Sequence, residues 1–242
     1  GVMTSDIKQR TSISSIRFVT ATIATFIVQG LTLPLVAKFG QGNAQKGWFV
    51  TITLFAAVAV VLLVITFFSA KERILPPANQ KNSIKQDFKD IVSNRPWKAM
   101  FVLTLFLFTT LAMWGSSMSY YFNYFVDKTS LFNFLQHFGL VTVDGNTYGL
   151  WHQFLDAFGL IALPDHSNVF AVGYSLFNMV GQIITLLGVI FLSGYLSNIF
   201  GKRNVFIVCL ALTAVFTSLF FVVDAKSVGL IFVINMLKSM AY

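Results

Sequence analysis

Five long apolar runs, separated by short polar breaks, limit what this chain can fold into. The complete runs cover residues 13–37, 48–69, 97–126, 169–196 and 205–223. A sixth run begins near Gly229 and continues to the last residue. A helix of about 20 residues crosses the roughly 30 Å hydrocarbon core of a bilayer. Because the runs lack the alternation of barrel strands, we predict an all-α membrane protein with five complete transmembrane helices and part of a sixth.

The composition supports a membrane protein and argues against the soluble classes. Charged residues make up 11% of the chain, against about a quarter in ordinary soluble domains. The net charge of +8 does not indicate a nucleic-acid partner, because the basic residues lie in the breaks and form no continuous face. The sequence has a single cysteine, Cys209, and no metal-ligand spacing, Walker motif or nucleophile elbow. We therefore expect neither an enzyme nor a metal or cofactor.

Lysine and arginine residues in the breaks predict the orientation of the chain, because cytoplasmic loops are enriched in them. The breaks on one side carry eleven of these residues: Lys8, Arg10, Lys71, Arg73, Lys81, Lys85, Lys89, Arg95, Lys98, Lys202 and Arg203. The breaks on the other side carry four, which are Lys38, Lys46, Lys128 and Lys226. We therefore expect residues 70–96 to be cytoplasmic and residues 127–167 to be external.

The two longest connections have patterns of their own. Residues 70–96 are polar and end in an amphipathic stretch, which predicts a cytoplasmic linker with a surface helix. Residues 127–167 contain two amphipathic segments with a turn signal at Asp144-Gly145-Asn146 between them. The apolar faces hold Leu131, Phe134, Leu135 and Phe138 in one segment, and Trp151, Phe154, Leu155 and Phe158 in the other. Such segments suit a hairpin at the membrane interface or a lid, while a loop packed on its own protein is the simpler interpretation.

Two basic residues lie inside apolar runs, where a charged side chain is costly. Arg17 lies about 6 Å from the cytoplasmic end of the first run. It is either a hydrogen-bond donor to a sugar or carboxylate, or an arginine that reaches back to the interface. Lys238 lies about nine residues into the last run, near mid-membrane, which favours a functional or paired lysine. The alternative is that this run is differently bounded.

The third run presents aromatic and hydroxyl side chains on one helix face. Trp114, Ser117, Tyr121 and Tyr124 follow one another at steps of three and four residues. Rings with hydroxyl groups suit a sugar, because the ring packs on the apolar sugar face and the hydroxyl meets its polar edge. We take Trp114 and Tyr121 as candidate cavity wall, and an outer aromatic belt is the alternative for the tyrosines.

The fourth run carries two amides that are one helical turn apart, Asn178 and Gln182. They are candidates for a polar cavity lining, and the alternative is a hydrogen bond that holds two helices together in lipid. A short basic loop with Lys202 and Arg203 follows this run on the cytoplasmic side. That loop sets topology and is a candidate gate contact.

Five groups of short motifs occur in order along the chain. They are Met3-Thr4-Ser5-Asp6 with Arg10-Thr11-Ser12 and Ser14-Ser15-Ile16-Arg17, then Asn94-Arg95-Pro96-Trp97, Tyr120-Tyr121-Phe122, Phe200-Gly201-Lys202-Arg203 and Leu237-Lys238. In this order they resemble the glycoside–pentoside–hexuronide:cation symporter family, a branch of the major facilitator superfamily. The resemblance covers nearly the whole chain except residues 127–167, which depart from the family pattern.

The resemblance implies a fold, a function and a location. The fold would be a partial major-facilitator bundle, in which residues 1–69 end the N-terminal six-helix half, 70–96 link the halves and 97–242 begin the C-terminal half. The function would be symport of a sugar with Na⁺ or H⁺ by alternating access, in a bacterial inner membrane. Arg17 would belong to the sugar site, and the coupling cation would bind helices outside this chain, which we expect to be an internal piece of a longer protein.

Two other functions remain open from the sequence. A lipid or lysolipid carrier on the same fold would pair Lys238 with an anionic headgroup. A membrane sensor that keeps the bundle but transports nothing is the other. The partners expected from the symporter interpretation are a sugar, a coupling cation and the lipid bilayer.

Overall fold

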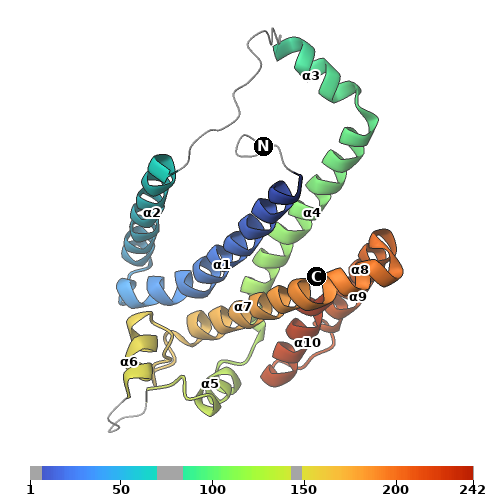
Figure 1. The fold of residues 1–242 in the computed structure, drawn as a ribbon. Helices are drawn as coiled ribbons and strands as arrows, with labels where there is room; N and C mark the ends of the chain where they lie inside the picture. Colours follow the sequence, from blue (N-terminus) through green and yellow to red (C-terminus); the bar gives the residue numbers. More distant parts are fainter. Residues whose placement is uncertain (1–6, 70–83, 143–148, 242) are drawn as a thin grey trace.

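The computed structural model describes residues 7–69, 84–142 and 149–241, and these residues are mainly helical (Figure 1). The helices that follow the predicted apolar runs are α1 (Ile7–Gly40), α2 (Ala44–Ser69), α4 (Arg95–Tyr120), α7 (Val169–Leu187), α9 (Lys202–Leu219) and α10 (Val228–Ala241). The π-helical stretch η1 (Tyr121–Phe125) continues α4, and η2 (Gly188–Ser193) and α8 (Gly194–Phe200) continue α7. The short helices are α3 (Ile84–Ser93), α5 (Lys128–His137) and α6 (Leu150–Ala157).

Four of these helices are long and apolar enough to cross a membrane. The spans are Ile16–Gly40, Ala44–Ser69, Arg95–Phe125 and Val169–Leu192. Two further apolar helices are shorter, Arg203–Leu219 and Val228–Ala241. The prediction of an all-α membrane protein is confirmed, although the fifth predicted run forms a shorter helix than the other four.

The start of α4 follows from its sequence. The side-chain oxygen of Asn94 accepts a hydrogen bond from the backbone N–H of Trp97 at 3.2 Å, which caps the first turn. Pro96 stands in that turn, where a missing N–H costs no hydrogen bond. Only Asn94 separates α4 from α3, and α3 forms where the amphipathic stretch predicted a short helix. Residues 70–83 of the predicted linker lie outside the described residues.

The prediction of a short basic loop between the fourth and fifth runs is wrong. The helix that starts as α7 continues through α8 to Phe200, and α9 begins at Lys202, so Arg203 lies in a first helical turn. Gly201 alone makes the reversal, with a φ of +78° that a residue with a side chain rarely adopts. The polar residues after the apolar run stay helical, which is why the sequence placed this end too early.

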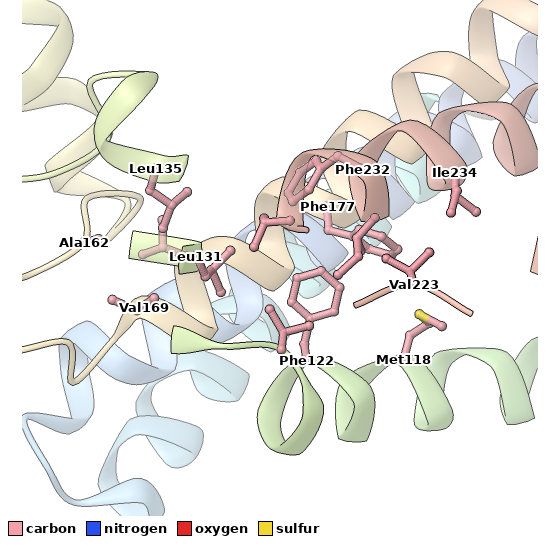
Figure 2. Packing of buried hydrophobic residues seen from close by; sticks show 14 of the residues in the cluster. Met118, Phe122, Leu131, Leu135, Ala162, Val169, Phe177, Val223, Phe232 and Ile234 are labelled. Carbon is pink, nitrogen blue, oxygen red and sulfur yellow. The ribbon is translucent and has the colours of Figure 1, made fainter. Parts of the chain in front are cut away.

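The buried core lies near the predicted outer ends of the helices (Figure 2). Phe122 of η1, Phe177 of α7 and Phe232 of α10 meet there, with ring centroids 4.7 Å apart for the first two and 5.7 Å for the last two. Leu131 and Leu135 of α5 are fully buried beside them. Fully burying an aliphatic or aromatic side chain contributes about 1.5–3 kcal/mol, so this cluster fixes η1, α5, α7 and α10 together.

The outer segment 127–167 contains the two predicted helices, and they end alike. Residues 134–141 read Phe-Leu-Gln-His-Phe-Gly-Leu-Val, and residues 154–161 read Phe-Leu-Asp-Ala-Phe-Gly-Leu-Ile. Gly139 and Gly159 have φ values of +70° and +71°, and both helices close with the same pair of C-terminal backbone hydrogen bonds. The two ends are joined by the bridge between Val141 and Ala162. The predicted turn at 144–146 lies outside the described residues.

The helix α5 corrects the idea of a hairpin lying at the membrane interface. Its apolar residues pack beneath α7 and α10, and a side-chain carbon at Gly173 would lie 2.7 Å from Leu131. The simpler interpretation, a loop packed on its own protein, therefore holds for α5. The helix α6 differs, because none of its residues is buried, and Leu150 and Trp151 are 85% and 70% exposed.

The helix α1 packs on both α2 and α7 near its outer end (Figure 1). A side-chain carbon at Gly30 would lie 2.6 Å from the side chain of Met179 in α7, so a larger residue here would require the methionine to move. Pro34 is inside α1 and fully buried. It has no N–H to bond the carbonyl of Gly30, so α1 lacks one helical hydrogen bond at this level.

Candidate functional site

A cavity of about 570 Å³ with several polar groups in its wall lies between five helices. Its wall takes residues from α1, α2, α4, α7 and α10, including the polar side chains of Thr25, Gln29, Thr32, Tyr174, Asn178, Gln182, Thr185, Asn235, Lys238 and Ser239. Aromatic rings come from Trp48, Trp114 and Phe177. The volume is within the range of pockets that bind small molecules.

The cavity lies about half a bilayer thickness from the predicted outer ends of the helices that line it. At 1.5 Å per residue, the outer end of each helix is about 14–17 Å from Gln29 in α1, Trp114 in α4–η1, Asn178 in α7 and Lys238 in α10. Half of a hydrocarbon core is about 15 Å. Side chains that are far apart in the sequence therefore lie at a similar depth.

Lys238 and Trp114 contact each other on the cavity wall. The Lys238 ammonium lies 3.8 Å from the centre of the Trp114 ring, over its face. Trp114 also packs edge to face with Phe220, with ring centroids 5.5 Å apart, which helps to hold the indole in place. A cation over an aromatic face gains about 2 kcal/mol where water is excluded, which offsets part of the cost of a charge at this depth.

Amide side chains connect the helices around the cavity. Gln182 of α7 donates a hydrogen bond to Gln29 of α1 at 3.1 Å. Asn235 of α10 donates to the backbone carbonyl of Phe177 at 2.8 Å. Gly181 permits that approach, since a side-chain carbon there would lie 3.1 Å from the Asn235 amide. The sequence left two alternatives for Gln182, a cavity lining or a hydrogen bond between helices, and the structure shows both.

Hydroxyl groups complete the wall. Tyr174 of α7 donates a hydrogen bond to the backbone carbonyl of Gly115 in α4 at 3.1 Å. Thr185 donates to the backbone carbonyl of Ser239 in α10 at 3.1 Å. Together with the amides they offer both donors and acceptors beside an aromatic face, an arrangement that matches a molecule with many hydroxyl groups and one apolar face.

The structure brings together four of the six residues predicted for substrate binding. Trp114, Asn178, Gln182 and Lys238 all line the cavity. The amides and the lysine were predicted because polar side chains deep in apolar runs are costly in lipid, and Trp114 because an aromatic ring suits the apolar face of a sugar. Their roles in binding stay predictions.

Arg17 and Tyr121 lie away from this cavity. Arg17 is about 35 Å along α1 from its outer end, and its side chain is exposed. Tyr121 is about 6 Å from the outer end of η1, and its hydroxyl donates to the carbonyl of Phe220 at 3.4 Å within the aromatic core. Arg203, the predicted gate residue, is exposed at the start of α9, and the side chain of Lys202 lies outside the described part.

The sequence interpretation missed Gln29, Tyr174 and Asn235. A signal was present for Asn235, because it stands one turn before Lys238 and Ser239 on the same face of α10. Gln29 is a lone amide inside an apolar run, at the same depth as Asn178. Among the described residues, no group of three His, Cys, Asp or Glu side chains is placed to hold a metal ion.

Comparison with known proteins identifies relatives. The family described as "MFS/sugar transport protein" matches residues 1–159. Among curated proteins, YicJ of Escherichia coli K12, named as an inner membrane symporter, is 33% identical over 132 residues, which are 54% of this chain and 28% of that protein. YagG of the same organism, named as a glycoside/cation symporter, is 31% identical over 147 residues, 60% of this chain and 32% of that protein.

A third relative adds a named sugar. The isoprimeverose transporter of Lactiplantibacillus pentosus is 28% identical over 144 residues, which are 58% of this chain and 30% of that protein. This chain therefore spans about a third of the length of the curated relatives it matches. No solved structure matches it.

Proposed function

The chain belongs to the MFS/sugar transport protein family, and from this premise we propose that it is part of a cation-coupled symporter of a sugar or glycoside. The observation that carries the proposal is the cavity at mid-membrane depth, with the face of Trp114 beside amide and hydroxyl groups. Transporters of this class bind substrate near the midplane, between two halves of the bundle.

Each part of the wall has a role in the proposed binding. The indole of Trp114 packs against the apolar face of a sugar ring, and Asn178 and Gln182 exchange hydrogen bonds with its hydroxyl groups. Lys238 adds a donor that moves from the Trp114 face toward a bound ligand. Arg17 stays a candidate sugar donor on the family resemblance, and it would act from the cytoplasmic side of this cavity.

The proposed mechanism is alternating access in the inner membrane. Residues 1–69 and 97–242 would belong to the two halves, and rocking of one half against the other would expose the cavity to each side in turn. A coupling cation, Na⁺ or H⁺, would raise the affinity for the sugar and the sugar would raise the affinity for the cation by the same factor. We expect the cation site on helices outside this chain.

Counterflow in vesicles tests the proposal. The full-length transporter is reconstituted, and exchange of labelled isoprimeverose, the sugar named for one relative, is measured against other glycosides. Trp114→Ala is expected to lower exchange about ten-fold, which corresponds to the loss of about 1.4 kcal/mol of ring stacking.

The matched control is Trp97→Ala on the same helix. Trp97 stacks on Phe101 at the cytoplasmic start of α4, with ring centroids 5.2 Å apart, and it does not line the cavity. Its variant should exchange sugar as the unmodified protein does. Equal losses in both variants, or uptake of lysolipid that no sugar inhibits, would contradict the sugar assignment.

A further inference from the structure

We infer that residues 149–168, which end the outer segment and lead into α7, are a clamp that holds α1 against α7 and so keeps the outer side of the cavity closed. The inference rests on the proposed function, because it assigns α1 and α7 to the two moving halves. The clamp consists of two contacts with α1, made by Asp156 and Gly159, and of a support that fixes both residues to α7.

The first contact is an ion pair. The Lys38 ammonium of α1 lies 3.2 Å from a carboxylate oxygen of Asp156, and it also donates a hydrogen bond to the backbone carbonyl of Asp156. The carbonyl belongs to the last turn of α6, where the partial negative charge of a helix end favours a cation. One lysine thus bonds both a side chain and a helix terminus.

The second contact is a close fit of backbone on backbone. Gly159 ends α6 in the left-handed conformation, and a side-chain carbon there would lie 2.6 Å from the carbonyl oxygen of Pro34. Its neighbours would include the Lys38 side chain at 3.3 Å. The glycine therefore lets the end of α6 rest directly on α1, one turn from the ion pair.

The support ties both contacts to α7. Asn168 immediately precedes α7, and its side-chain amide donates to the carbonyl of Ile161 at 2.8 Å, while its oxygen accepts from the N–H of Leu163 at 2.8 Å. Ala162 donates to Leu140 at 2.8 Å, which joins this stretch to the end of the buried helix α5. Residues 156–168 therefore move with α7.

Closure continues from the clamp down to the cavity. One turn below Pro34, Gly30 meets Met179, and the adjacent Gln29 accepts its hydrogen bond from Gln182. Figure 1 shows α1 and α7 together near this end and diverging toward the other ends of both helices. Opening the cavity to the outside would separate α1 from α7, and the ion pair and the Gly159 contact would have to break first.

Labelling of a cysteine in the cavity measures opening without any sugar. In a full-length background in which every native cysteine, Cys209 included, is replaced by serine, Thr32→Cys places a thiol on the part of α1 that lines the cavity. A membrane-impermeant maleimide is added from outside, and its rate of reaction reports how often the outer side opens. The labelling rate does not depend on the identity of the substrate. The clamp hypothesis can therefore be refuted while the proposal of sugar transport is supported, and the proposal of sugar transport can be refuted while the clamp is supported.

The clamp predicts a defined pattern of rates. Asp156→Gln and Lys38→Gln should each raise labelling at least three-fold, and the double variant should not exceed the larger single effect. Gln136→Asp is the matched control, because Gln136 has the position in α5 that Asp156 has in α6, and it should change nothing. Rates within two-fold of the parent in both single variants, or effects that simply multiply, would overturn the clamp.

A disulfide provides a second test that does not rely on loosening the structure. Lys38→Cys with Asp156→Cys in the same background, once oxidised, should lower labelling of Cys at position 32 at least five-fold, and reduction should restore the rate. A disulfide that forms and leaves the labelling rate unchanged would also refute the inference.

Discussion

Two short helices on the outer side of the molecule, α5 and α6, end in nearly the same eight residues, and their surroundings differ completely. In α5, Leu131 and Leu135 are 1% and 0% exposed beneath α7 and α10. In α6 no residue is buried, and Asp156 of its last turn and the following Gly159 contact α1. A shared sequence therefore sets how each helix forms and ends, while its neighbours determine whether the helix belongs to the core or to a movable contact.

Truncation of one leucine in each helix should separate the two environments most strongly. Leu135→Ala removes a fully buried side chain and is expected to cost about 2–5 kcal/mol of unfolding free energy, whereas Leu155→Ala, at the matching half-buried position, should cost roughly 1 kcal/mol. Thermal unfolding in detergent measures the difference. Equal losses would mean that α5 is not part of the core.

The two helix-ending glycines give a narrower comparison. Gly139→Ala should cost about 1–2 kcal/mol from the left-handed backbone alone, because nothing lies within 4 Å of the added carbon. Gly159→Ala has the same backbone cost and also pushes against the carbonyl of Pro34, so its loss should be larger. The same unfolding experiment ranks them, and the comparison breaks if Gly139→Ala is the worse of the two.

The helix starts differ in their response to acid. Asp127 caps α5, and hydrogen bonds from Ser130 hold the pKa of its carboxyl group below the usual value, whereas α6 is capped by Gly149 with no side chain. A lowered pKa stabilises α5 above about pH 3.9, and this contribution is lost as the pH falls from there through the folded-state pKa.

Hydrogen exchange, corrected for the intrinsic pH dependence of amide exchange, checks this smallest effect. Amides in the first turn of α5 should lose protection below about pH 4, and those of α6 should not change over the same range. Asp127→Asn should remove the pH dependence of α5. Parallel losses in both helices would show that the cap is not responsible.

Most of the fold could be predicted from the apolar runs, because a continuous apolar segment in a membrane forms a helix, which satisfies its own backbone hydrogen bonds. The ends of the helices could be predicted less well. The π-helical stretch η2 and the single-residue reversal at Gly201 depend on backbone geometry that hydropathy does not record. The different burial of α5 and α6 could not be predicted, because the two segments have nearly the same sequence pattern.

The candidate cavity was predictable as far as depth and helix face could be read. Trp114, Asn178, Gln182 and Lys238 stand deep in apolar runs, and the structure places them around one cavity. Arg17 was assigned to the sugar site by resemblance, and α1 carries it toward its cytoplasmic end. Gln29 escaped notice because its partner, Gln182, is on a helix far away in the sequence.

Pro34 gives the outer end of α1 a mechanical property of its own. Because the helix lacks one internal hydrogen bond between Gly30 and Pro34, bending there costs less than elsewhere along α1. The last turns, with Lys38, can pivot about this point while the turns around Gln29 keep their contacts. Release of the proposed clamp can therefore begin with a small tilt of the six residues after Pro34, without displacement of the whole helix α1.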